Sequence, residues 1–181
     1  LMLATRPGGC VVRTGDQRCG TRVIPLVVQK ERMERARALA GDTPLLRLVP
    51  LKQKKFGVVT TGSEVKNGLI EDKFTPILQR KLAEFGCEMV CHACPGDEAD
   101  AITGEVLGML DAGCEMVFCT GGMSVDPDDR TPLAIKNTGA RIVSYGAPVL
   151  PGAMFLVAYL PDGRPVCGLP GCVMYAKRTV F

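Results

Sequence analysis

The fold of this chain is indicated most clearly by residues 116–132, which read MVFCTGGMSVDPDDRTP. The apolar run at 116–119 is typical of a buried β-strand, and it leads directly into Gly121 and Gly122. Glycine has no Cβ, so these positions allow positive φ and let a ligand approach the backbone closely. An aspartate shortly before Thr131 and Pro132 is typical of a helix start. The stretch therefore predicts a strand, a tight loop and a helix, in that order.

The loop within this stretch also carries groups that can hold an anion and a cation. The backbone N–H groups of Gly121 and Gly122, together with the Ser124 hydroxyl, can hold an anionic oxygen such as that of a phosphate. Three carboxylates follow, on Asp126, Asp128 and Asp129. Carboxylates beside a phosphate site usually bind Mg²⁺, because the cation offsets their repulsion. The alternative for the same residues is a polar loop that only leads into a capped helix.

Strands and helices alternate regularly from residue 56 onward. Strands are expected at 56–60, 87–94, 114–120, 141–145, 154–160 and 165–169, with a hairpin turn at 161–164. Helices are expected between residues 74 and 85, after residue 98, at 131–137 and after residue 171. In the second of these helices, an apolar stripe at helical spacing is formed by Ile102, Val106, Met109 and Leu110. This alternation predicts βαβ units and a mostly parallel sheet.

Glycines and polar residues follow four of these expected strands. They are Thr61, Gly62, Ser63 and Glu64; Asp97; Thr120, Gly121, Gly122, Met123 and Ser124; and Gly168, Leu169, Pro170 and Gly171. In parallel sheets of this kind, ligands bind outside the carboxyl ends of the strands. We therefore expect the four groups to share one rim and to form a single binding site.

Residues 1–54 differ in charge from the rest of the chain. Residues 1–55 hold 12 Lys and Arg against 4 Asp and Glu, whereas residues 56–181 hold 10 against 15. Strands are expected at 21–28 and 45–49, and a charged helix is expected at 30–40, ended by Gly41. Because the basic residues are interleaved with these patterns, a solvated face or an inter-domain contact is preferred to nucleic-acid binding. We interpret this small α+β segment as the tail of a preceding domain.

The sequence contains no signal peptide and no apolar run long enough to cross a membrane. Its nine cysteines are therefore expected to be reduced thiols in a cytoplasm. The chain begins with Leu and stops within an expected helix, so we expect it to be a fragment of a longer protein.

Three of the cysteines, Cys87, Cys91 and Cys94, have the spacing that binds an iron–sulfur cluster in radical S-adenosylmethionine enzymes. The segment has strand character, which predicts that Cys87 and Cys91 point to one face and Cys94 to the other. A plain strand is therefore preferred both to a cluster and to a zinc site that includes His92, the single histidine.

Residues 55–181 resemble the molybdenum-cofactor-biosynthesis domain found in molybdopterin adenylyltransferases, molybdopterin molybdotransferases and gephyrin-like proteins. The resemblance rests on Thr-Gly-x-Glu at 61–64, the Gly-Gly loop with Asp129-x-Thr131, Pro151-Gly152, and Gly-Leu-Pro-Gly at 168–171. Met123-Ser124 after the Gly-Gly pair is closer to the molybdotransferase branch than to the Thr-Gly of the adenylylating branch. The resemblance implies a three-layer α/β/α sandwich with a mostly parallel sheet.

The resemblance also implies ligands and roles for particular residues. The ligand would be molybdopterin, as cofactor precursor, with Mg²⁺, ATP or AMP, and molybdate. The residues 61–64, 120–124 and 168–171 would bind molybdopterin, with Gly121, Gly122 and Ser124 on its phosphate. Asp129 and Asp97 would be catalytic, and Asp128 and Asp129 would bind the metal. Molybdoenzymes or other cofactor-biosynthesis proteins would be partners, and the chain would form a dimer or trimer with itself.

The sequence departs from the family pattern at two further positions. Ser63 replaces an aspartate, which removes a metal or molybdate ligand, and Cys172-Val173 replaces an Asn-Pro pair. The first departure leaves open a non-catalytic carrier or sensor of molybdenum cofactor. The run Asp128-Asp129-Arg130-Thr131 leaves open a Mg²⁺-dependent nucleotide pyrophosphatase, since a related family on the same domain carries a similar motif.

Overall fold

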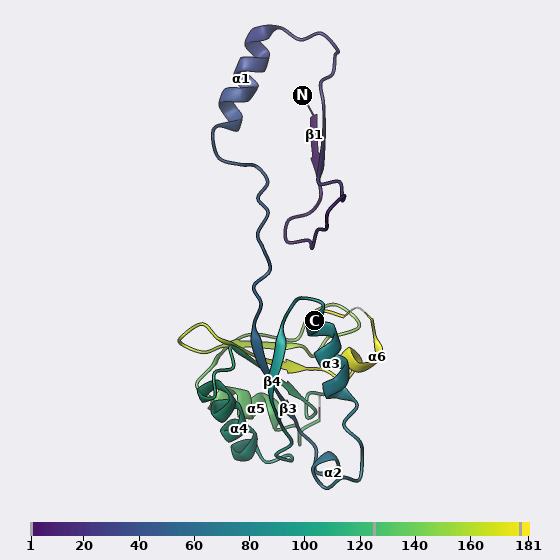
Figure 1. The fold of residues 1–181 in the computed structure, drawn as a ribbon, viewed down its shortest axis with the longest axis vertical. Helices are drawn as coiled ribbons and strands as arrows, with labels where there is room; N and C mark the ends of the chain where they lie inside the picture. The colour runs from purple at the N-terminus through teal and green to yellow at the C-terminus, as the bar shows by residue number, and fades with distance from the viewer. Residues whose placement is uncertain (1, 125, 178) are drawn as a thin grey trace. The chain divides into compact units, whose positions relative to one another are not determined.

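The computed structural model describes residues 2–124, 126–177 and 179–181 (Figure 1). The chain separates into two compact units, residues 1–50 and residues 51–181. The role of the first unit as the tail of a preceding domain stays a prediction. Within the described residues, the structure contains no helix of the length and apolar character that a bilayer crossing requires.

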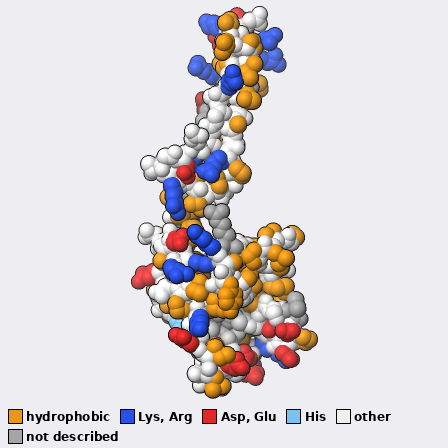
Figure 2. Space-filling model, turned by 90° about the vertical axis from the view of Figure 1, so that its right-hand side faces the viewer, with side chains coloured by type: hydrophobic (Ala, Val, Ile, Leu, Met, Phe, Trp, Pro, Cys, Tyr) orange, Lys and Arg blue, Asp and Glu red, His pale blue; other side chains and the backbone are white. Residues whose placement is uncertain are grey.

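The first unit contains little regular structure. Strands β1 (Met2–Thr5) and β2 (Cys19–Arg22) pair antiparallel, and α1 (Lys30–Ala40) has no buried residue. The helix is confirmed, with Gly41 at its end in the left-handed region at φ 62°. Of the strand expected at 21–28 only residues 21 and 22 lie in β2, and the strand expected at 45–49 is wrong, because residues 23–28 and 45–49 find no partner strand among the described residues. In Figure 2, Lys and Arg side chains of this unit lie in small separate groups on the visible face.

The second unit is built on one six-stranded sheet with the order β4-β3-β5-β8-β7-β6. Its strands are β3 (Lys55–Thr60), β4 (Glu88–Ala93), β5 (Met116–Thr120), β6 (Arg141–Tyr145), β7 (Leu156–Tyr159) and β8 (Pro165–Leu169). The pairs of β3 with β4, β3 with β5, and β5 with β8 are parallel, and β7 runs antiparallel to both of its neighbours. The mostly parallel sheet and the 161–164 hairpin are therefore confirmed.

Helices cover both faces of this sheet (Figure 1). They are α2 (Ser63–Lys66), α3 (Phe74–Ala83), α4 (Ala99–Asp111), α5 (Thr131–Asn137) and α6 (Cys172–Tyr175). One core cluster lies between the sheet and α4 with α5, and a second lies between the sheet and α3 with α6. The Lys81 ammonium ties α3 to α6 by donating to the carbonyls of Val173 and Ala176, each at 2.8 Å. The expected three-layer α/β/α fold is confirmed.

The apolar stripe of α4 is buried as expected, with Ile102 and Val106 fully inaccessible. The end of α4 is held by Arg164 from the 161–164 turn. Its guanidinium donates to the Leu110 carbonyl at 2.7 Å and the Cys114 carbonyl at 3.3 Å. The last carbonyls of a helix have no hydrogen-bond partner inside the helix. Arg164 supplies one to Leu110, in the last turn of α4, and also bonds Cys114 just beyond the helix.

The predicted facing of the cysteines in β4 is wrong. The pairing of β3 with β4 shifts register, so that Phe56 is opposite Met89 but Gly57 is opposite Cys91. One extra residue in a strand turns everything after it to the other face. As a result, Cys87 packs against the core cluster beneath α3 and Cys91 against the cluster beneath α4.

Candidate ligand-binding site at the carboxyl end of the sheet

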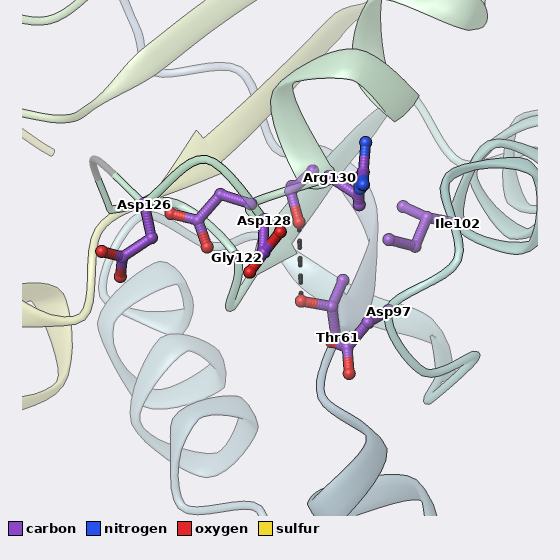
Figure 3. Close-up of a pocket in the computed structure, with 9 residues that line it drawn as sticks. Thr61, Asp97, Ile102, Gly122, Asp126, Asp128 and Arg130 are labelled. Carbon is purple, nitrogen blue, oxygen red and sulfur yellow. Dashed lines mark hydrogen bonds between the residues drawn. The ribbon is translucent and has the colours of Figure 1, made fainter.

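A cavity of about 430 Å³ opens at the carboxyl ends of β3, β4 and β5 (Figure 3). Its lining residues are Thr61, Asp97, Ile102, Gly122, Asp126, Asp128, Asp129, Arg130 and Thr131. Three of the four groups expected on the rim thus supply part of its lining. The fourth, at 168–171, supplies none of it.

The Gly-Gly loop is shaped by close contact with β3 and α5. Gly121 has φ 84°, and a Cβ at this position would lie 2.6 Å from the Thr61 carbonyl oxygen. Gly122 has φ 53°, and its Cβ would lie 2.8 Å from the Thr131 hydroxyl oxygen. That hydroxyl in turn donates to the Gly121 carbonyl at 2.8 Å. The two glycines are therefore required by packing as well as by backbone conformation.

Met123 and Gly168 act together in the core. The Met123 side chain is 4% exposed, packs in the cluster beneath α4 and α5, and does not line the cavity. A Cβ on Gly168 would lie 2.5 Å from the Met123 sulfur. The absence of a side chain at Gly168 thus leaves the space that Met123 fills, and this contact holds the Gly-Gly loop against β8.

Two of the loop carboxylates converge on one hydroxyl. The Ser124 oxygen lies 2.8 Å from Asp126 Oδ2 and 2.9 Å from Asp129 Oδ2. A hydroxyl has a single proton, so it can donate to only one of these carboxylates at a time. Figure 3 shows Asp126 and Asp128 on the loop, with Asp97 and Thr61 across from them. Asp126 and Asp129 therefore each place one carboxylate oxygen within hydrogen-bond distance of the Ser124 hydroxyl, and carboxylate oxygens are ligands that Mg²⁺ prefers.

Asp97 is held in place by Ser63. Its Oδ2 accepts hydrogen bonds from the Ser63 N–H and the Ser63 hydroxyl, both at 2.7 Å. The carboxylate therefore caps the start of α2 from a neighbouring loop. Lys66 of the same helix donates to the Pro95 carbonyl at 3.0 Å. An aspartate at position 63 would set two carboxylates against each other, whereas Ser63 forms a hydrogen-bonded pair with Asp97.

The remaining predicted residues lie around this site without lining it. Gly62 precedes α2 with φ 130°, and Glu64 is exposed on that helix. Thr120 is buried, and its hydroxyl has no hydrogen-bond partner among the described residues. Leu169 is fully buried beneath α3, and Pro170 with Gly171 forms the turn into α6.

Two further residues bear on the site, and neither is among the predicted site residues. Arg130 lines the cavity and brings a positive charge to it. Tyr145, at the end of β6, does not line the cavity, but its pKa is raised by burial and, to a lesser extent, by the negative charge of Asp129. A signal for Arg130 existed, since it lies within the Asp-Asp-Arg-Thr run. A single tyrosine at a strand end carries no such signal.

Comparison with known proteins places this chain in a family. Residues 57–181 match the family described as "Probable molybdopterin binding domain". A molybdopterin molybdenumtransferase from Synechococcus elongatus is 24% identical over 161 residues, which cover 84% of this chain and 38% of that protein. A CinA-like protein from Mycolicibacterium gilvum is 32% identical over 152 residues, which cover 70% of this chain and 36% of that protein. The chain thus spans little more than a third of the length of either relative.

Solved structures agree on the fold. The molybdopterin biosynthesis enzyme MoaB from Thermus thermophilus superposes with a TM-score of 0.58 at 21% identity. The match covers 66% of this chain and 82% of that one. This chain belongs to the molybdopterin-binding domain family of molybdenum-cofactor biosynthesis. The resemblance drawn from the motifs is therefore confirmed.

Proposed function

We propose that the cavity binds molybdopterin through its phosphate and that the chain adenylylates molybdopterin or inserts molybdate into it with the help of Mg²⁺. The observation that supports this most strongly is the convergence of a glycine loop, three loop carboxylates and Arg130 on one cavity. Glycine loops suit phosphate, and carboxylates beside them suit a divalent cation.

Each group in the site has a distinct part in this proposal. The N–H groups of Gly121 and Gly122 orient the phosphate, and Arg130 adds a positive charge at the opening. Asp128 and Asp129 hold Mg²⁺, which when bound neutralises charge on the reacting oxygens. Asp97 is the second catalytic carboxylate, and Ser63 keeps it pointed in a single direction. Fixed donors of this kind stabilise developing charge without reorganising during the reaction.

The test is incubation of the chain with molybdopterin, Mg-ATP and molybdate, following pterin species and AMP by chromatography. Adenylylated pterin would identify the first half-reaction, and AMP release with molybdenum insertion would identify the second. Asp129→Asn should keep the fold and lose turnover, because it removes a metal-binding charge. Asp111→Asn, which changes an exposed aspartate at the end of α4, is the matched control. Turnover that survives in Asp129→Asn would remove this residue from the mechanism.

A carrier or sensor of molybdenum cofactor is the second candidate, and it is favoured by Ser63. This residue uses its N–H and hydroxyl to hold Asp97 and adds no carboxylate of its own to the site. Such a protein would bind pterin tightly and consume no ATP. Equal pterin binding with and without Mg-ATP, and no AMP formed, would select it.

A nucleotide pyrophosphatase is the third candidate, and it is favoured by the carboxylates and Arg130, which need no pterin to act on a pyrophosphate. It predicts Mg²⁺-dependent hydrolysis of a dinucleotide in the absence of pterin. Activity confined to pterin substrates would exclude it.

We also propose that the chain works in the cytoplasm as a homodimer or homotrimer, and that it delivers its product to molybdoenzymes or other proteins of the same pathway. Light scattering coupled to size-exclusion chromatography would measure its mass in solution. A monomer at working concentrations would contradict the oligomer.

A further inference from the structure

A second polar cluster lies on the other side of the strand end that borders the cavity. Thr60 and Thr61 are consecutive residues, and their side chains point to opposite faces of the sheet. The Thr61 hydroxyl lies 3.5 Å from Thr131, at the cavity. The Thr60 hydroxyl instead contacts Asp72 at 3.0 Å and His92 at 3.1 Å, on the side covered by α3.

Three side chains in this cluster each present a metal-binding atom. They are Asp72 from the loop before α3, His92 from β4, and Cys94 just beyond β4. His92 Nε2 lies 3.1 Å from Asp72 Oδ2 and 3.7 Å from Cys94 Sγ, and all three atoms lie within 4.8 Å of one another. Around a tetrahedral zinc ion, the corresponding separations are about 3.4 Å and about 3.6 Å.

The Asp72 carboxylate is already oriented by its surroundings. Its Oδ1 accepts the N–H groups of Phe74 and Thr75, at 2.8 and 3.1 Å, and so caps α3. Its Oδ2 accepts the hydroxyls of Thr75, at 2.6 Å, and of Thr60, at 3.0 Å. Hydrogen bonds of this kind fix the ligands of natural metal sites and tune their affinity.

The cluster is also accessible. The His92 side chain is 33% exposed and that of Asp72 14% exposed, and the pale blue histidine atoms reach the surface in Figure 2. An ion can therefore enter without unfolding, and water can complete its coordination. A set of one thiolate, one imidazole and one carboxylate suits zinc rather than Mg²⁺, which prefers oxygen ligands alone.

We propose that Asp72, His92 and Cys94 bind one Zn²⁺, with water in the fourth position. This site is separate from the molybdopterin cavity, and it stands whether or not the proposed function holds. It reverses the preference drawn from the cysteine spacing. That spacing grouped Cys94 with Cys87, which lies before the start of β4, and with Cys91, which the bulge turns to the face beneath α4. It gave no hint of Asp72.

The test uses the full chain, reduced and stripped of metal with a chelator, and titrated with Zn²⁺ and with Co²⁺. We expect one equivalent to bind and the midpoint of thermal unfolding to rise. Cobalt should give the intense visible bands of a tetrahedral ion and a thiolate-to-metal charge-transfer band. Loss of one ligand, in Cys94→Ser or His92→Gln, should weaken binding by more than the roughly 10- to 100-fold that loss of a supporting hydrogen bond costs.

Controls separate this site from the other cysteines. Cys87→Ser, a half-buried thiol beside the same strand, should bind as the unchanged chain does. Thr75→Val removes one hydroxyl from Asp72 and should weaken binding about tenfold while keeping the cobalt spectrum. Asp72→Asn is avoided as a first test because Asp72 also caps α3. The proposal is overturned if no stoichiometric ion binds, or if Cys94→Ser binds cobalt with an unchanged charge-transfer band.

Discussion

Replacing Gly121 with alanine should destabilise the second unit strongly, because two costs arise at one position. The left-handed backbone conformation, at φ 84°, costs a residue with a Cβ about 1–2 kcal/mol. The added Cβ would also lie 2.6 Å from the Thr61 carbonyl oxygen, so the loop and β3 must separate by about 0.8 Å to reach ordinary contact. Overpacking of this kind costs about 1–3 kcal/mol, which gives about 2–5 kcal/mol in all.

The assay is urea unfolding followed by far-ultraviolet circular dichroism, with the midpoint and the slope both fitted. Gly163→Ala is the matched control, because Gly163 also has positive φ, at 86°, but has nothing within 4 Å of its would-be Cβ. The control should lose only the conformational part, about 1–2 kcal/mol. If Gly121→Ala costs no more than Gly163→Ala, the contact between the loop and Thr61 contributes nothing and the packing argument is wrong.

Two further predictions concern helix α4 and the buried thiols. Gly104→Ala should raise the free energy of unfolding by about 0.5–1 kcal/mol, since the helix interior at Gly104 has open space and alanine is the better helix former; a decrease in the same urea assay would contradict this. Burial raises the pKa of Cys167 to about 12, so an unfolded chain loses this proton at about pH 8.5 while the folded chain keeps it. Stability should therefore be unaffected by this thiol below pH 8.5 and should fall above it by up to about 1.4 kcal/mol per pH unit. Cys167→Ala should flatten that decline, whereas Cys10→Ala, at an exposed cysteine, should not; identical slopes in both variants would refute the account.

Much of the second unit could be predicted because its strands and helices are long enough for hydrophobic periodicity to show. The stripe on α4 and the helix at 131–137 are examples, and both are as predicted. Residues 23–28 and 45–49 were expected in strands and form none, because apolar residues alone do not make a strand without a partner. The bulge in β4 was also invisible, since alternation cannot reveal one inserted residue whose partner strand is unknown.

The candidate site, like the fold, could be predicted from the sequence only in part. The rim was predictable because the carboxyl ends of parallel strands meet at one edge of a sheet, and three of the four expected groups line the cavity there. The structural role of Gly168 could not be predicted. It makes room for the Met123 side chain, and that contact joins residues 45 positions apart in the sequence. Asp72 escaped notice for a similar reason, since it lies in an irregular loop and meets His92 only through the fold.

The strand order has a consequence for how this protein is made. β8 is the last strand along the chain, yet it lies between β5 and β7 near the middle of the sheet. On a ribosome, β3, β4 and β5 emerge first, and the apolar edge of β5 stays open until residues 165–169 have been synthesised. Open apolar edges invite pairing with other chains, and late non-local pairing is slow. The nascent unit therefore cannot complete its sheet before residue 169 has been translated, and until then the edge of β5 is exposed to the kind of misassembly that chaperones prevent.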